Sequence, residues 1–369
     1  MTKQGKCCGI GTLTFQDALN YGAILQCYAL QESIKHQGYE TEVLNYASPV
    51  IRLSNWPNMN ARGSLSARVK SFLKRGYLTR RKASFDRFKE QCLTISHVFS
   101  EAEFSHVCKR YRKIIVGSDQ VWNPVLTHGD LNYFLKGVDH PTGKTSFSAS
   151  IGLSSFPEEY TTEIRKLLLD FGLIAVREET AAKEIQRLTG IRAEVVCDPV
   201  MLLTREQWSA IAQGEGSIIE RPYVLYYALG MPDKSIIREA KRYVRSRGMR
   251  LIVLHNSPSV LRGCTSDNSC DPRSWLAYFA NADLVITSSF HGICFSLLFG
   301  RQFTCMSNGK NRDVSSRITD LLERYGLTNR TDLGIAESAS DPIDWKHVQK
   351  MISMERSKGS RLLKQILEL

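Results

Sequence analysis

The chain has 369 residues, of which 43% are hydrophobic and 23% are charged, and its formal net charge is +12. At about 150 residues per domain this length predicts two globular domains, and the composition excludes a disordered chain. No apolar run approaches the ~20 residues that cross a bilayer, and no apolar segment follows the charged residues 1–6. We therefore expect a soluble, cytoplasmic protein whose ten cysteines are free thiols.

Short apolar runs alternate with helical patterns along the first half of the chain. Residues 10–14 predict a strand, residues 22–37 a helix that ends at Gly38, and residues 42–46 a second strand. Further strands are expected at 113–116, 144–150, 173–176 and 194–197, and helices at 161–171 and 178–188.

The second half of the chain repeats this rhythm from residue 223 onward. Strands are expected at 223–229, 250–255, 284–287 and 302–306, and helices at 234–247, 273–280, 293–299, 314–325 and within 345–367. Strands that alternate with helices predict parallel βαβ units. Ligands bind such sheets outside the carboxyl ends of the strands, so chemistry is expected where strands stop.

These elements predict an α/β fold with two Rossmann-like, doubly wound domains that face a cleft. We expect an N-terminal domain at 1–205, a C-terminal domain at 206–344, and C-terminal helices at 345–369 that pack back on the N-terminal domain.

A basic helical segment lies at 62–90, within the predicted N-terminal domain. It holds ten basic residues and two acidic ones, Asp86 and Glu90, for a net charge of +8. Such a segment is typical of a protein that meets an acidic partner, such as the inner face of a membrane, or of a solvated helix face without a ligand. No nucleic-acid recognition motif accompanies it, so a nucleic-acid partner is not expected.

The strongest local pattern is the turn Ser289-Phe290-His291-Gly292 after the strand 284–287. A helix start offers N–H groups and the positive end of the helix dipole to an anion. His291 is placed there to bind a phosphate or to donate a proton. The alternative is a histidine that only caps or packs, and the strand-end position favours the functional interpretation.

Two further turns follow predicted strands. In Gly117-Ser118-Asp119-Gln120-Val121-Trp122-Asn123-Pro124, Asp119 is a candidate base and Trp122 a candidate platform for a sugar ring, with Asn123 beside them. An Asx-type turn with a packed tryptophan is the alternative. Before the first long helix, Asp17, Asn20 and Gly22 form a weak analogue of a phosphate-binding turn.

Cations near the predicted strand ends complete the candidate site. Arg177 follows the strand 173–176 and is able to bind an anion in bidentate fashion, unless it pairs with Glu178 or Glu179. Lys310 and Arg312 follow the last strand. No cysteine and histidine spacing fits zinc, and no dinucleotide or nucleotide motif occurs, so no metal and no cofactor are expected.

Taken in order, these segments resemble the polysaccharide pyruvyl transferase family. The resemblance runs from Asn20-Tyr21-Gly22-Ala23-Ile24-Leu25-Gln26 through the turn at 117–124, Val176-Arg177-Glu178 and Asp198-Pro199 to 282–300, and ends in the helix after Arg317. It implies a glycosyltransferase-B-like fold. It also implies transfer of a pyruvyl group from phosphoenolpyruvate, the donor substrate, to the hydroxyls of a sugar or lipid-linked oligosaccharide in a cell-surface or capsular polysaccharide precursor, with a ketal and phosphate as products.

In this resemblance Arg177 matches the family's arginine after the strand and His291 the histidine of its turn. His291 would bind phosphate or protonate the enol carbon, Arg177 would hold the carboxylate or phosphate, and Asp119 or Asp17 would accept the hydroxyl proton. Many members read Arg-Leu-His-Gly, whereas Ser289 stands at the arginine position here. Lys310 or Arg312 would replace that cation, and Ser289 and Gly292 would contact the donor.

Two alternatives remain from the sequence. A glycosyltransferase with a nucleotide-sugar donor would use the same fold and the same cations. A non-catalytic binding module would use the segment 62–90 to dock to a partner or to a membrane, where a lipid-linked acceptor would also lie.

Overall fold

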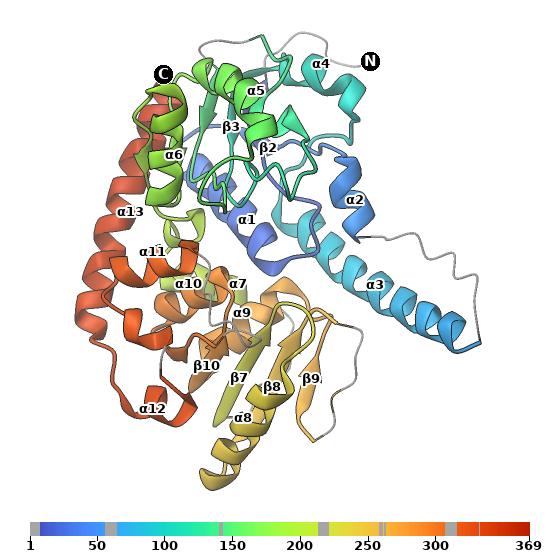
Figure 1. The fold of residues 1–369 in the computed structure, drawn as a ribbon, viewed down its shortest axis with the longest axis vertical. Helices are drawn as coiled ribbons and strands as arrows, with labels where there is room; N and C mark the ends of the chain where they lie inside the picture. The colour runs from blue at the N-terminus through green and yellow to red at the C-terminus, as the bar shows by residue number, and fades with distance from the viewer. Residues whose placement is uncertain are drawn as a thin grey trace. The chain divides into compact units, whose positions relative to one another are not determined.

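The computed structural model describes residues 8–55, 65–139, 143–212, 221–257, 261, 263–306, 316–331 and 333–369. The chain divides into two compact units, each built around a parallel sheet (Figure 1). Unit 1 comprises Met1–Pro57, Lys89–Leu203 and Met354–Leu369, and unit 2 comprises Asn58–Phe88 and Thr204–Ser353.

The sheet of unit 1 has the strand order β2-β1-β3-β4, and every pairing is parallel. Its strands are β1 (Cys8–Leu13), β2 (Thr41–Val43), β3 (Tyr111–Val116) and β4 (Lys144–Ser146). A parallel pair, β5 (Ala175–Val176) and β6 (Glu194–Val195), continues the sheet, because bridges join Thr145 to Leu173 and Ala149 to Val176.

Helices and short 3₁₀ turns lie between these strands along the chain. They are α1 (Tyr21–His36), α2 (Pro49–Asn55), α4 (Phe104–Cys108), α5 (Glu158–Leu169) and α6 (Glu179–Thr189), with short 3₁₀ turns η1 (Glu101–Glu103), η2 (Leu131–Phe134) and η3 (Pro199–Met201). The helix α1 is buried along most of its length. Ala23 of α1 and Leu13 of β1 belong to the same hydrophobic core. Gly38 follows it in the left-handed region, as its predicted terminator role requires.

The sheet of unit 2 has the strand order β11-β10-β7-β8-β9, again wholly parallel. Its strands are β7 (Tyr223–Ala228), β8 (Arg250–His255), β9 (Thr265–Asp267), β10 (Leu284–Thr287) and β11 (Gln302–Thr304). The helices are α7 (Arg205–Ala212), α8 (Lys234–Ser246), α9 (Pro272–Asn281), α10 (Phe290–Phe299), α11 (Ser316–Arg324), η4 (Thr328–Thr331) and α12 (Ile335–Ser340). The predicted α/β class with two Rossmann-like sheets is confirmed.

The last helix, α13 (Trp345–Glu368), contributes its second half to unit 1. Arg112 on β3 donates to the carbonyl of Leu367 at 2.9 Å, and the ammonium of its neighbour Lys113 donates to Ile366. Arg356 on α13 donates to the carbonyls of Met201 and Leu203 at 3.0 and 2.9 Å. Charged side chains therefore attach residues 354–369 to β3 and to the segment 201–203 of unit 1.

The basic segment forms the long helix α3 (Leu65–Cys92), and its described side chains divide into an exposed and a buried face. The aromatic side chains Tyr77, Phe85 and Phe88 are buried, so they form a packing stripe. Arg81 is also buried, and its guanidinium donates to the carbonyl of Asn268 at 2.9 Å. The segment 62–90 was predicted to belong to the N-terminal domain, but the described part of α3 up to Phe88 belongs to unit 2.

The exposed face of α3 carries Arg75, Arg80, Lys82 and Arg87, of which Lys82 pairs with Asp86. Arg62 lies outside the described residues. In the part of the chain that the structure describes, no helix has the length and apolar character that a membrane crossing needs.

Replacement of Arg81 by alanine is expected to lower the free energy of unfolding by about 2–4 kcal/mol, because it removes a buried hydrogen bond and its packing on Phe85. Arg80→Ala, one residue away and exposed, is the control and is expected to change it by less than about 0.5 kcal/mol. Urea unfolding of the two variants provides the comparison. Equal stabilities would show that the burial of Arg81 has no energetic consequence.

Candidate functional site

The strand order of unit 1 reverses between β1 and β3, which is the topological switch point of its sheet. Ligands bind open α/β sheets outside the carboxyl ends of the strands at this point. The carboxyl end of β1 continues into Thr14–Asn20, and that of β3 into Gly117–Asp119. Two of the three turns that the sequence singled out therefore flank one switch point.

Asn20 is the N-cap of α1, and its side-chain oxygen accepts hydrogen bonds from the N–H groups of Gly22 and Ala23 at 2.9 and 3.3 Å. These donors are thereby satisfied within the protein. Asp17 precedes them, and its carboxylate pairs with Lys89 at 3.0 Å and with Arg52 at 3.9 Å. The turn at 17–22 is thus organised by the Asn20 cap and by ion pairs of Asp17 with Lys89 and Arg52.

The turn after β3 has a backbone that only certain residues tolerate. Gly117 has φ +114°, and a Cβ atom there would lie 2.5 Å from the carbonyl oxygen of Phe147. Asp119 also lies in the left-handed region, at φ +73°, and its carboxylate accepts the N–H of Gln120 at 2.9 Å. This geometry presents the Asp119 side chain at the strand end.

Gln26 on α1 links the ends of β1 and β3. Its amide nitrogen donates to Thr14 at 2.8 Å, and its amide oxygen accepts the N–H of Ser118 at 3.2 Å. Thr14 in turn donates to the carbonyl of Ser118 at 2.8 Å. All three side chains are buried, so the two turns are held in one arrangement.

Arg177, directly after β5, is buried among three carboxylates. Its guanidinium donates to Asp198 at 2.8 Å and lies 3.7 Å from Glu178 and 3.9 Å from Asp119. Burial opposes its charge, but the carboxylates of Asp198, Glu178 and Asp119 outweigh that effect and raise the pKa of Arg177. Arg177 therefore joins the carboxyl ends of β3, β5 and β6.

The partners of Arg177 extend this network. Asp198 also accepts the hydroxyl of Ser118 at 3.0 Å, and it caps η3 by accepting the N–H of Val200. Glu178 accepts the hydroxyl of Ser150 at 2.8 Å and the N–H of Ile151 at 3.0 Å. Asp198 is a site residue that was not predicted from the sequence, although Asp198-Pro199 is part of the family resemblance. Its signal was an acidic residue at a strand end followed by a proline.

Trp122 is not a sugar platform in this structure. Its ring has no exposed surface, stacks on Phe134 and donates from its indole nitrogen to the carbonyl of Tyr133 at 2.9 Å. Asn123 is buried as well, and its side-chain oxygen accepts the N–H groups of Val125 and Leu126. The Asx-turn interpretation of this segment holds, because the tryptophan is more stable in the core than at the surface.

The sheet of unit 2 has its own switch point, between β7 and β10. Ser289 follows β10 as the N-cap of α10 and accepts the N–H of Gly292 at 3.3 Å. His291 lies in the first turn of α10 and is buried. A Cβ atom on Gly292 would lie 2.8 Å from the Thr287 hydroxyl, so a glycine lets the helix start this close to the strand. The predicted position of His291 at a strand end and helix start is confirmed.

A second histidine, His255, ends β8, which pairs with β7 on the side away from β10, and it was not predicted from the sequence. Its Nδ1 accepts the N–H of Ser257 at 3.3 Å, so its Nε2 carries the proton and donates to Ser266 at 2.9 Å. Burial lowers the pKa of His255 and keeps the ring neutral. The sequence did contain a signal for His255, because a histidine ends the predicted strand 250–255.

Lys310 and Arg312 lie outside the described residues, so their predicted roles stay predictions. Among the described residues, no group of three or more His, Cys, Asp and Glu side chains is arranged to hold a metal ion. The described groups at the two switch points are thus carboxylates with arginine in unit 1, and a helix start with histidine in unit 2.

The family model for polysaccharide pyruvyl transferase matches residues 20–311, which include Asn20, the turn after β3, Arg177, Asp198 and His291. The chain belongs to the polysaccharide pyruvyl transferase family. Membership of this family makes the protein an enzyme of the transferase class in polysaccharide biosynthesis. No curated protein matches its sequence.

Solved structures similar to this chain are distant in sequence. MnaA from S. aureus, in a co-structure with UDP, is 10% identical with a TM-score of 0.48, over 92% of this chain and 94% of that chain. A putative UDP-N-acetylglucosamine 2-epimerase from Listeria monocytogenes is 11% identical with a TM-score of 0.47, over 96% and 97%. MurG from Acinetobacter baumannii is 11% identical with a TM-score of 0.40, over 98% and 99%.

Because Arg177 and Asp198 form a buried ion pair, we expect their substitutions to be strongly coupled in their effects on the free energy of unfolding. Arg177→Met alone is expected to cost about 3–5 kcal/mol of stability, because it leaves buried carboxylates without their cation. The double variant Arg177→Met with Asp198→Asn is expected to cost less than the sum of the single variants. Chemical denaturation measures each term, with the exposed Lys166→Met as a control that should change stability by less than about 0.5 kcal/mol. Additive single effects would contradict the pairing.

Proposed function

We propose that this enzyme moves the pyruvyl group of phosphoenolpyruvate to two hydroxyls of one sugar in a polysaccharide precursor. The ketal carbon forms two new C–O bonds, and its bond to the phosphate oxygen breaks. One hydroxyl proton ends on the methylene carbon, which becomes a methyl group, and the other leaves with phosphate. The observation that carries the proposal is His291 in the first turn of α10, at the switch point of unit 2 and within the matched family segment.

The donor is assigned to unit 2. The start of α10 supplies the positive end of a helix dipole for the phosphate or the carboxylate. His291 supplies a hydrogen bond to the phosphate or a proton to the methylene carbon of the enol. Ser289 stabilises the helix start through Gly292, so it shapes this site without adding a charge. We assign the positive charge that the family's arginine would supply at position 289 to Lys310 or Arg312.

The acceptor is assigned to unit 1, because its switch point carries several carboxylates. The charge of Arg177 is already balanced by Asp198, Glu178 and Asp119. We therefore assign Arg177 to the positioning of these carboxylates and not to direct binding of the donor. Asp119, presented at the strand end, accepts the proton of the sugar hydroxyl. Asp17 is the second candidate base, and its pairing with Lys89 makes it the weaker one.

An activity assay with matched histidine variants tests the donor site. Phosphoenolpyruvate and candidate oligosaccharide or lipid-linked acceptors are incubated with the enzyme, and mass spectrometry and phosphate release report the ketal. His291→Ala is expected to lower turnover about 10²–10⁴-fold, the range for loss of a general acid. His347→Ala, at an exposed position on α13, is expected to keep full turnover.

Near-full turnover in His291→Ala would contradict the assignment of His291. Sugar transfer from a nucleotide-sugar, with no reaction of phosphoenolpyruvate, would instead show a glycosyltransferase.

We further propose that the exposed cations of α3 bring the enzyme to the inner face of a membrane, where a lipid-linked acceptor would lie. The enzyme is expected to co-sediment with vesicles that contain phosphatidylglycerol, and the replacement of Arg75, Arg80 and Arg87 by glutamine is expected to abolish this binding at 0.1 M salt. Vesicles of phosphatidylcholine alone are the control. Unchanged co-sedimentation of the variant would exclude α3 as the contact.

A further inference from the structure

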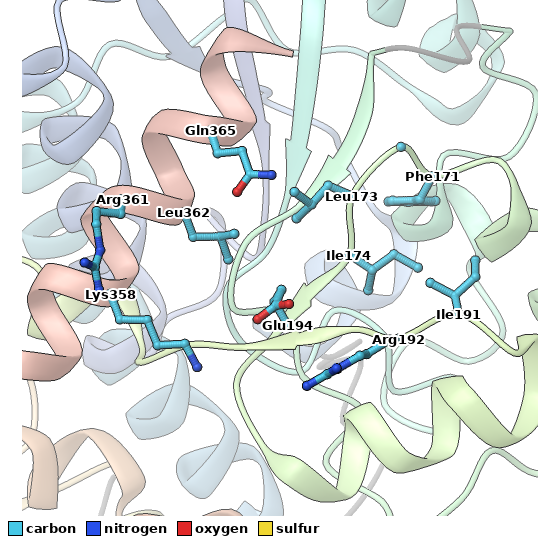
Figure 2. A pocket seen from close by; sticks show the side chains of 11 residues that line it. Phe171, Leu173, Ile174, Ile191, Arg192, Glu194, Lys358, Arg361, Leu362 and Gln365 are labelled. Carbon is cyan, nitrogen blue, oxygen red and sulfur yellow. The ribbon is translucent and has the colours of Figure 1, made fainter.

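A pocket of about 430 Å³ lies within unit 1, away from the strand ends discussed so far. Its walls are the segment that precedes β5, the segment that leads into β6, and the last turns of α13 (Figure 2). It therefore opens at the amino ends of β5 and β6, whereas Arg177 and Asp198 follow their carboxyl ends. We call it the α13 pocket.

One part of the α13 pocket is strongly basic. Arg192, Lys358 and Arg361 line it together with one carboxylate, Glu194, so these groups carry a net charge of +2. Figure 2 shows Lys358 and Arg192 extending into the pocket from opposite walls, one from α13 and the other from the segment before β6. No ion pair among the described residues involves any of the three cations. Their charge is thus available to a ligand.

Most of the remaining lining is apolar, and Gln365 is its one uncharged polar side chain. Five hydrophobic side chains contribute to it, namely Phe171, Leu173, Ile174, Ile191 and Leu362. A cavity of this size falls within the ~300–1,000 Å³ typical of small-molecule sites, which combine an apolar wall with a few placed polar groups. The pocket therefore suits a ligand with an anionic end and an apolar body.

We infer that the α13 pocket binds a phosphate monoester whose organic group is apolar. At neutral pH a phosphate monoester carries about −1.5 to −2 charges, which matches the net +2 of the lining, whereas a single carboxylate would leave a cation unbalanced. Arg192 and Arg361 offer planar donors that fit phosphate oxygens, and Lys358 adds a point charge. The apolar wall receives the organic group, which phosphoenolpyruvate is too small to supply.

This site lies beyond the proposed transfer reaction and does not depend on it. The ligand chemistry is shared by a soluble aryl or nucleoside phosphate and by the headgroup of a phosphatidic acid. The probes are therefore inorganic phosphate, phenyl phosphate and dihexanoyl phosphatidic acid, each titrated into the full-length protein by isothermal calorimetry. Phenyl phosphate is expected to bind more tightly than inorganic phosphate, and the tightest probe identifies the source of the natural ligand.

Variants locate the binding. The double variant Arg192→Ala with Lys358→Ala is expected to weaken phenyl phosphate binding at least about tenfold, since each charge-assisted hydrogen bond is worth on the order of a factor of ten. Leu362→Asp is expected to weaken phenyl phosphate more than inorganic phosphate. Lys364→Ala, on the same helix but outside the lining, is the control and should leave binding unchanged.

His291→Ala separates this site from the proposed donor site. Phenyl phosphate binding that survives in His291→Ala and is lost in the Arg192 and Lys358 variant supports the α13 pocket. Binding that is lost in His291→Ala and unchanged in the pocket variant would overturn it, as would no heat of binding for any probe. Failure of pyruvyl transfer with intact phenyl phosphate binding would count against the proposed function alone.

Discussion

A single buried guanidinium, that of Arg177, holds the carboxyl edge of unit 1 together. It faces Asp198, Glu178 and Asp119, which come from the ends of three different strands or the turns after them. A charge buried to this extent is tolerated only with close partners of opposite sign. The ends of these strands must therefore lie close together. Ser118, which donates to Asp198, and the turn that holds Asp119 are fixed at the same place.

The two sheets offer different chemistry at equivalent positions. At its switch point, unit 1 presents carboxylates that are held by arginine and by lysine. Unit 2 presents a helix start with His291 after β10, and His255, whose pKa is lowered by burial, ends β8 on the other side of β7. A helix start favours an anion and a carboxylate favours the removal of a proton, so the division supports a donor in unit 2 and a hydroxyl acceptor in unit 1.

Much of the fold followed from local patterns. The strand at 284–287 and the helix start after it were predicted because strand and helix periods repeat within a few residues. The strand predicted at 144–150 ends at Ser146 instead, and Ser148 lies in the left-handed region that interrupts a strand. Trp122 was placed in the site because its neighbours follow a strand, and nothing local indicates that its ring stacks on Phe134.

The sequence by itself determined the alternation of strands and helices, the strand-end positions of Asp119, Arg177 and His291, and the family. These depend on neighbours along the chain. Only the tertiary structure decided that Arg81 is buried against Asn268, that Arg177 is paired with Asp198, and that Arg192 shares a pocket with Lys358. Burial and pairing depend on segments distant in the chain, and no local pattern encodes which of them will meet.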